Sequence, residues 1–280
     1  MRRILITAAF TALFSLSAAA DGNGGCLPSS KTGQMPFGPG ETLNYALSFN
    51  WHSVATDVAR ASTKVDTLTF NGKKAYHVRM QGRTAQFFEI FYKVREDFQS
   101  WFTCDGLKPL KFIRDTHEGN YFAYNLYHYN PREGVINAAL NNKKHGRSVI
   151  TLPLGKCTYD LPGLLFYCRN MDITDLSPGK GYTLSFAIDD DVYSITLTYK
   201  GRETKQIKGL GNVACMKFGC SVVEGEMFDG KEDAELWISD DDNRIPVYFF
   251  APMRVGGVSG RLSSWSGLAH EFTSLKSGKK

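Results

Sequence analysis

The chain has 280 residues, and its 33 lysines and arginines against 28 aspartates and glutamates give a formal net charge of +5. The basic residues form no clustered footprint of the kind that nucleic-acid binding needs, which argues against that class of protein. After the N-terminal segment, no apolar stretch reaches the ~20 residues of a membrane-spanning helix.

The N-terminal segment MRRILITAAFTALFSLSAAA has the parts of a secretory signal: two arginines, an apolar run from Ile4 to Leu16, and small residues before Asp21. We predict a signal peptide over residues 1–20, in preference to an uncleaved anchor. Its removal leaves 31 basic residues against 28 acidic ones and lowers the net charge to +3. We expect residues 21–35 to be flexible, residues 36–275 to form a single β-rich domain, and residues 276–280 to be a disordered tail.

From Phe37 onward, apolar and polar residues alternate with period two, which is typical of half-buried strands. Turn signals rich in Gly, Pro and Asn separate these runs, among them NGKK from Asn71 and SPGKG from Ser177. The pattern predicts an all-β, mainly antiparallel fold: a strongly curved sheet, or an open or half β-barrel, with one or two short helices.

One segment interrupts the strand pattern. In YDLPGLLFYCRNMDITDL, Asp160 stands at an N-cap position, Pro162 falls in the first turn, and apolar residues then recur at helical spacing. We predict a short helix here, packed against the concave face of the sheet. A second short helix around residues 86–92 is the alternative to a strand, because FFEIFY is also good strand material.

Two segments resemble each other: WFTCDGLKPLKF from Trp101 and WISDDDNRIPVYF from Trp237. Each runs from a tryptophan through a hydroxyl residue and an Asp-containing turn to a basic residue, a proline and an apolar strand. Chance similarity is the favoured explanation, with two related halves within the domain as the alternative.

Two aspartate triplets, at residues 189–191 and 240–242, each lie between alternating runs. A helix-flanked calcium loop counted from Asp240 would need a ligand at its fifth position, where Arg244 stands, and a glycine at its sixth. We therefore predict that both triplets are hairpin turns, since Asp tolerates turn conformations and hydrogen-bonds its own backbone. No metal site and no cofactor are predicted.

No catalytic arrangement follows from the spacing. His117-Glu118 lacks the second histidine of a zinc-protease motif, and the glycine turns lack the residues of a phosphate loop. Glu224 and Glu226 alternate onto one face, and a carboxylate pair can hydrolyse glycosides, although solvated glutamates are the commoner case. Whether the protein is an enzyme stays open, with the balance against it.

Six cysteines are spread along the chain: Cys26, Cys104, Cys157, Cys168, Cys215 and Cys220. Export makes disulfides possible, and the two closest pairs, Cys157–Cys168 and Cys215–Cys220, are the candidate bridges, with free buried thiols as the alternative. Cys26 follows GNGG rather than the apolar run, which favours an unmodified cysteine over a lipid-modified one.

Three ordered motifs carry a resemblance: FGPGETLNYALSFNW, YDLPGLLFYCRNMD and ELWISDDDNRIPVYF. The chain resembles a bacterial exported family known as domain of unknown function 3108, from about Phe37 to Leu268. The resemblance implies an exported protein of a Gram-negative envelope, periplasmic or outer-membrane associated, and no agreed activity. It also marks a set of motif residues, which we expect to be structural: Glu41, Tyr45, Tyr159, Asp160, Trp237, Arg244 and Pro246.

The tryptophan hairpin is also similar to one in periplasmic lipoprotein carriers, and fold-level likeness does not establish function. Export and aromatic content favour a binding protein or carrier for an apolar or lipid-like ligand. The expected cavity residues are Trp51, Phe88, Phe91 and Tyr124, with core packing as the alternative role. An envelope-assembly partner protein and a hydrolase of envelope material are the competing hypotheses.

Overall fold

The computed structural model describes residues 26–27, 29, 33–51, 54–144, 146–222, 234–253 and 255–276. The predicted signal peptide and the pair Glu224 and Glu226 lie outside these ranges, as do residues 277–280.

Strands dominate the described part of the chain. In order they are β1 (Thr42–Trp51), β2 (Val54–Phe70), β3 (Lys73–Thr84), β4 (Val94–Thr103), β5 (Pro109–Glu118), β6 (Tyr121–Asn130), β7 (Val135–Asn142), β8 (Gly146–Pro153), β9 (Thr158–Tyr159), β10 (Gly181–Ile188), β11 (Asp191–Ile207), β12 (Gly211–Val222), β13 (Ala234–Ser239), β14 (Pro246–Pro252), β15 (Gly257–Ser266) and β16 (Leu275–Lys276). The helical elements are η1 (Gln86–Ile90), α2 (Leu161–Arg169) and η2 (Ile173–Asp175), of which η1 and η2 are 3-10 turns.

The strands form one sheet in the order β8-β7-β6-β5-β4-β3-β2-β1-β15-β14-β13-β12-β11-β10-β9, and β16 pairs with β12. The pairing of β9 with β10 is parallel and the other ladders are antiparallel. The sheet is not closed, because β8 and β9 lie at its two ends. This confirms the predicted all-β class with a curved, open sheet.

Hairpin turns set the register of neighbouring strands. Asn71 and Gly72 both have positive φ between β2 and β3, as a two-residue turn of this hand requires. Strand β4 then alternates buried and half-buried residues along its length, so one face of the sheet packs inward. The aspartate triplets lie at the β10–β11 and β13–β14 turns, which confirms the turn prediction.

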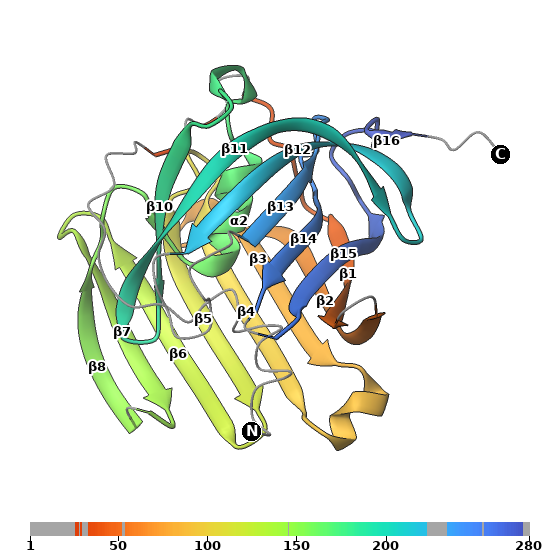
Figure 1. The fold of residues 1–280 in the computed structure, drawn as a ribbon. Helices are drawn as coiled ribbons and strands as arrows, with labels where there is room; N and C mark the ends of the chain where they lie inside the picture. Colours follow the sequence, from red (N-terminus) through yellow and green to blue (C-terminus); the bar gives the residue numbers. More distant parts are fainter. Residues whose placement is uncertain are drawn as a thin grey trace.

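Helix α2 covers the concave face of the sheet, as predicted. The Asp160 side chain caps it, accepting a hydrogen bond from Gly163 N at 2.8 Å and another from Ser100 Oγ of β4 at 2.9 Å. The long strands β11 and β12 arch over one end of the sheet, and α2 lies beneath them (Figure 1). The main core cluster joins α2 to both halves of the sheet, so the space beneath the arch is filled with side chains. No helix among the described residues is long and apolar enough to cross a membrane.

The first aspartate triplet connects two parts of the sheet that are far apart in the strand order. Asp189, with φ of 51°, accepts hydrogen bonds from Arg114 of β5 and, at 3.0 Å, from Asn125 Nδ2 of β6. The Tyr127 hydroxyl donates to the Asp189 carbonyl at 3.0 Å. The β10–β11 turn therefore bridges strands that are distant in the sheet order.

The disulfide joins Cys26 to Cys157 across 131 residues, while Cys104, Cys168, Cys215 and Cys220 form no disulfide among the described residues. Both predicted pairings are therefore wrong. Proximity in sequence is a poor guide in a sheet protein, because β12 carries Cys215 and Cys220 along one extended strand. The bridge instead joins Cys26 to the β8–β9 connection.

Candidate functional site

Residues of the three family motifs meet around one buried arginine. Arg169, at the end of α2, forms two hydrogen bonds to Glu41, from Nη1 to Oε1 at 2.5 Å and from Nη2 to Oε2 at 2.8 Å. Both side chains have no exposed surface. Arg169 Nη2 also donates to the carbonyls of Pro36 and Asn243, at 3.0 and 2.9 Å. The paired charges are thereby fully hydrogen-bonded, which is the condition for burying them.

Arg244 of the last motif also contacts the end of α2, by donating to a backbone carbonyl. Arg244 has a positive φ of 48°, and its side chain donates to the Met171 carbonyl just after α2. Burial lowers the pKa of Arg244 from its ordinary value. These contacts connect α2 to the β13–β14 turn, and a structural role for the motif residues stays a prediction.

Trp237, Tyr159 and Pro246 of the motifs are also buried, and Tyr45 is half-buried. Trp237 donates its indole N–H to Glu203 Oε1 at 2.5 Å, and the Lys205 ammonium lies 3.8 Å from the ring centroid. Tyr159 stacks on Tyr167 with centroids 4.4 Å apart, and Pro246 begins β14 opposite Ile238. Burial raises the pKa of Tyr45, whose hydroxyl has no hydrogen-bond partner in the described part of the chain.

The predicted cavity residues are dispersed. Phe88 is half-buried against the small cluster of Leu47, Val58 and Ala59. Phe91 is 73% exposed and Tyr124 is 50% exposed, while the Trp51 side chain lies outside the described part of the structure. Ligand binding by these residues stays a prediction.

A groove of about 1020 Å³ does exist, on the face of β1–β5 opposite to the buried core residues Val78 and Phe98. A row of basic residues crosses it. Cα partners pair Arg60 of β2 with Arg83 of β3, Arg83 with Arg95 of β4, and Arg95 with His117 of β5. Like charges directly opposite each other on neighbouring strands are destabilising, so this row is costly without a counter-charge.

Two of the arginines that line the groove have carboxylate partners. Arg95 Nη2 lies 2.6 Å from Glu89 Oε1 of η1. Arg261 of β15 binds Asp57 through two hydrogen bonds of 2.7 Å each, and this interaction lowers the Asp57 pKa to about 2. Arg60 and Arg83 have no acidic partner among the described residues.

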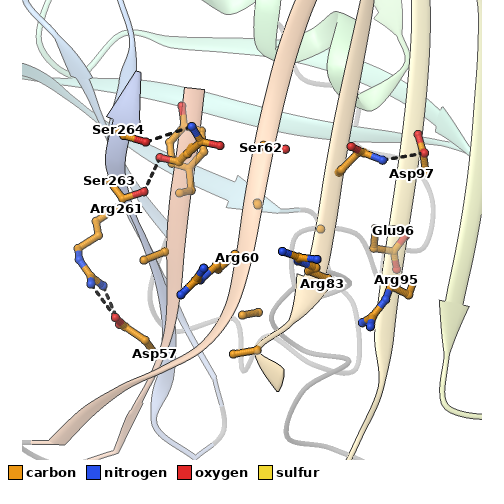
Figure 2. Close-up of a pocket in the computed structure, with 18 of the residues that line it drawn as sticks. Asp57, Arg60, Ser62, Arg83, Arg95, Glu96, Asp97, Arg261, Ser263 and Ser264 are labelled. Atoms are coloured by element: carbon orange, nitrogen blue, oxygen red, sulfur yellow. Dashed lines mark hydrogen bonds and ion pairs between the residues drawn. The ribbon is translucent and has the colours of Figure 1, made fainter. Parts of the chain in front are cut away.

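Ala46, the strand neighbour of Arg60, lies on the groove face, whereas Ala59, Ala61 and Gly82 belong by register to the face of Val78. Figure 2 shows Arg60 and Arg83 in the middle of the groove, with the Arg261–Asp57 pair on one side and Arg95 on the other. The remaining walls are polar, with Asn44 and Ser264 bonded at 3.1 Å and Gln81 bonded to Asp97 at 3.0 Å. The volume of the groove and the two guanidinium groups without an acidic partner leave room and charge for an anion.

A buried carboxyl pair lies on the opposite side of β4. Glu96 Oε2 accepts from Thr116 Oγ1 at 2.5 Å, and Glu96 Oε1 and Glu118 Oε1 are buried without a donor in the described part of the chain. Burial, followed by the charge of Glu118, raises the Glu96 pKa well above its ordinary value, and burial raises that of Glu118. A proton held by the pair would supply the missing donor. Groups of three or more metal-ligating residues are absent from the part of the chain that the structure describes.

These carboxyl groups predict a pH dependence of stability. Burial also raises the Asp160 pKa to about 7. A carboxyl with a raised folded-state pKa stays protonated in the folded chain after it has ionised in the unfolded one, so stability falls as pH rises through that interval. We expect the free energy of unfolding, from urea titrations, to decrease between about pH 4.5 and about pH 7.5, by up to ~4 kcal/mol from Asp160 alone.

Glu96→Gln should make this slope shallower without removing the part that comes from Asp160, because a glutamine at this position cannot ionise and its amide can donate to Glu118. The exposed Glu133 provides the control, since Glu133→Gln should leave the slope unchanged. A wild-type stability that rises from about pH 4.5 to about pH 7.5 would contradict the assignment of raised pKa values.

Sequence reasoning missed the groove, although one signal was available. The Asn71–Gly72 turn pairs Phe70 with Lys73, and the same register continues without interruption to Arg60 opposite Arg83. The positions of Arg261 and His117 beside them depend on strand neighbours that the sequence does not specify.

The fold and groove define an open, β-barrel-like protein with a polar surface groove. A crystal structure of a beta-barrel-like protein of domain of unknown function DUF1849 from Brucella abortus is similar over 87% of this chain and 98% of that chain, with a TM-score of 0.51 and 10% identity. Residues 44–263 match the family described as protein of unknown function DUF3108. The chain belongs to this family, which confirms the resemblance seen in its motifs.

Two further crystal structures show weaker likeness. A Bacteroides fragilis protein described as exported, with a YmcC-like fold, covers 86% of this chain and 100% of its own at 9% identity and a TM-score of 0.36. A Parabacteroides distasonis protein described as a lipoprotein covers 83% and 97% at 12% identity and a TM-score of 0.29. No curated protein matches the chain.

Proposed function

We propose that this protein is an exported, periplasmic binding protein whose groove takes the anionic group of a ligand between Arg60 and Arg83. The observation that carries the proposal is the pair of adjacent guanidinium groups without a counter-ion among the described residues. Guanidinium groups bind phosphate and carboxylate through charge-assisted hydrogen bonds. The signal-like N-terminus and the Cys26–Cys157 bridge support export, because disulfides persist in oxidising compartments.

The polar lining of the groove favours an anionic ligand over the apolar ligand that the sequence suggested. A wholly apolar ligand would match apolar walls, whereas these walls carry arginine, asparagine, serine and aspartate. A lipid-like ligand fits this groove through a phosphate or carboxylate head rather than through its chains.

The test is a titration with inorganic phosphate at constant ionic strength, followed by NMR of the arginine side-chain N–H signals. We expect saturable shifts at Arg60 and Arg83, and at least about ten-fold weaker binding in the Arg60→Gln, Arg83→Gln double variant. Arg132→Gln is the matched control, because Arg132 is exposed in the β6–β7 turn outside the groove. Unchanged phosphate binding in the double variant, or none by the wild type, would refute the anion site.

The envelope-assembly alternative rests on a different observation. Strand β8 is an edge of the sheet, and Val149 on it is 81% exposed. An unpaired edge can accept a strand from a partner protein. A pull-down from envelope extracts that recovers a partner with wild type but not with a proline-substituted β8 would favour that function.

A further inference from the structure

The connection between β3 and β4 exposes a cluster of large apolar side chains. Phe87 is 70% exposed, Ile90 is 82% exposed, and Phe91 is similarly open. The rings of Phe87 and Phe91 lie 6.4 Å apart, so the exposed residues form one patch. Single exposed apolar residues are ordinary, but a contiguous patch marks an interaction surface.

Residues next to the patch fix the position of η1 on the sheet. Phe88 is half-buried against the cluster of Leu47, Val58 and Ala59, and its ring also contacts that of Phe87, with centroids 5.3 Å apart. The Ala85 amide donates to the Val58 carbonyl at 2.8 Å, and Glu89 is ion-paired with Arg95 at 2.6 Å. With η1 fixed on both sides, burying Phe87, Ile90 and Phe91 in the core would require breaking these contacts.

Basic residues lie near η1 at the same ends of the strands, which we call the η1 edge. Exposed Lys93 follows the patch, and its carbonyl accepts from Gly119 N of the β5–β6 turn at 2.9 Å. The Lys143 ammonium of the β7–β8 connection reaches the Asn120 carbonyl of that turn at 3.0 Å, which places the two connections side by side. Exposed Arg147 lies just beyond, and η1 and these turns line the lower edge of the sheet in Figure 1.

We propose that this edge docks the protein on the surface of an anionic lipid bilayer, with Phe87, Ile90 and Phe91 inserted at the headgroup boundary. Aromatic and aliphatic side chains with flanking basic residues match both parts of such a surface, the acyl boundary and the negative headgroups. The charge complementarity selects an anionic bilayer over an uncharged one. Docking goes beyond the proposed groove function and does not require a ligand in the groove.

The test is co-sedimentation of the exported chain with vesicles of phosphatidylcholine alone or with about one third phosphatidylglycerol. We expect binding to the anionic vesicles and at least about ten-fold weaker binding to the neutral ones. The triple variant Phe87→Ser, Ile90→Ser, Phe91→Ser should lose binding, with Phe88 kept to preserve the anchor. Val149→Ser is the matched control, because Val149 is equally exposed away from η1.

Two further measurements distinguish insertion from electrostatic adsorption and from self-association. Phe91→Trp in vesicles with brominated acyl chains should show quenched tryptophan emission, and unquenched emission would overturn insertion. Retained binding by the folded triple variant, checked by circular dichroism, would also overturn the proposal. If the wild type binds no vesicles and is a dimer that the triple variant dissociates, the patch joins two copies of this chain, and membrane docking is wrong.

Discussion

Replacing Arg169 with methionine is expected to lower the free energy of unfolding by about 3–5 kcal/mol, because Glu41 is left as an uncompensated buried charge. The loss also removes the hydrogen bonds that Arg169 donates to the Pro36 and Asn243 carbonyls. Equilibrium urea unfolding of the oxidised protein, followed by tryptophan fluorescence and circular dichroism, measures the change.

A double variant separates the ion pair from general packing damage. Glu41→Leu combined with Arg169→Met removes both charges, so it should recover a large part of the loss. A cost below about 1 kcal/mol for Arg169→Met alone would contradict the burial of the pair.

Trp237→Ala is expected to cost about 3–5 kcal/mol, since it leaves a large cavity in the second core cluster. Trp237→Phe should cost less, because it keeps an apolar ring and loses mainly the hydrogen bond to Glu203. Urea unfolding measures both variants.

Trp101 supplies the comparison for Trp237. It is half-buried and stacks on His77 with ring centroids 4.5 Å apart, so Trp101→Ala should be clearly milder. Equal losses for the two alanine variants would show that burial does not distinguish these tryptophans.

The second aspartate triplet has one feature that its local sequence predicts and one that it does not. Its position in a turn followed from the properties of aspartate, and the β13–β14 connection has that form. Asp241 does more than shape the turn: Oδ1 accepts from Ser239, Asn243 and Arg244, and Oδ2 accepts from both the amide and the hydroxyl of Ser274. The bonds to Ser274 join distant segments, so no local pattern could predict them.

The same division applies to the cysteines and the groove. Cys215 and Cys220, which are close in sequence, lie on the extended β12, whereas the bonded Cys26 and Cys157 meet only where the N-terminal segment packs against the β8–β9 connection. In the groove, Arg261 reaches Asp57 because β15 lies beside β1 in the folded sheet. That neighbour relation joins the two ends of the domain.

The sequence by itself determined the local structure of this protein: strands from two-residue alternation, turns from Asn, Asp and Gly, and the α2 start from Asp160 and Pro162. These features depend on interactions between residues close in the chain. Only the tertiary structure decided the Arg169–Glu41 pair, the disulfide and the row from Arg60 to His117. Each depends on which strands become neighbours and in what register, and the order of strands in an open sheet is set by the packing of its whole core.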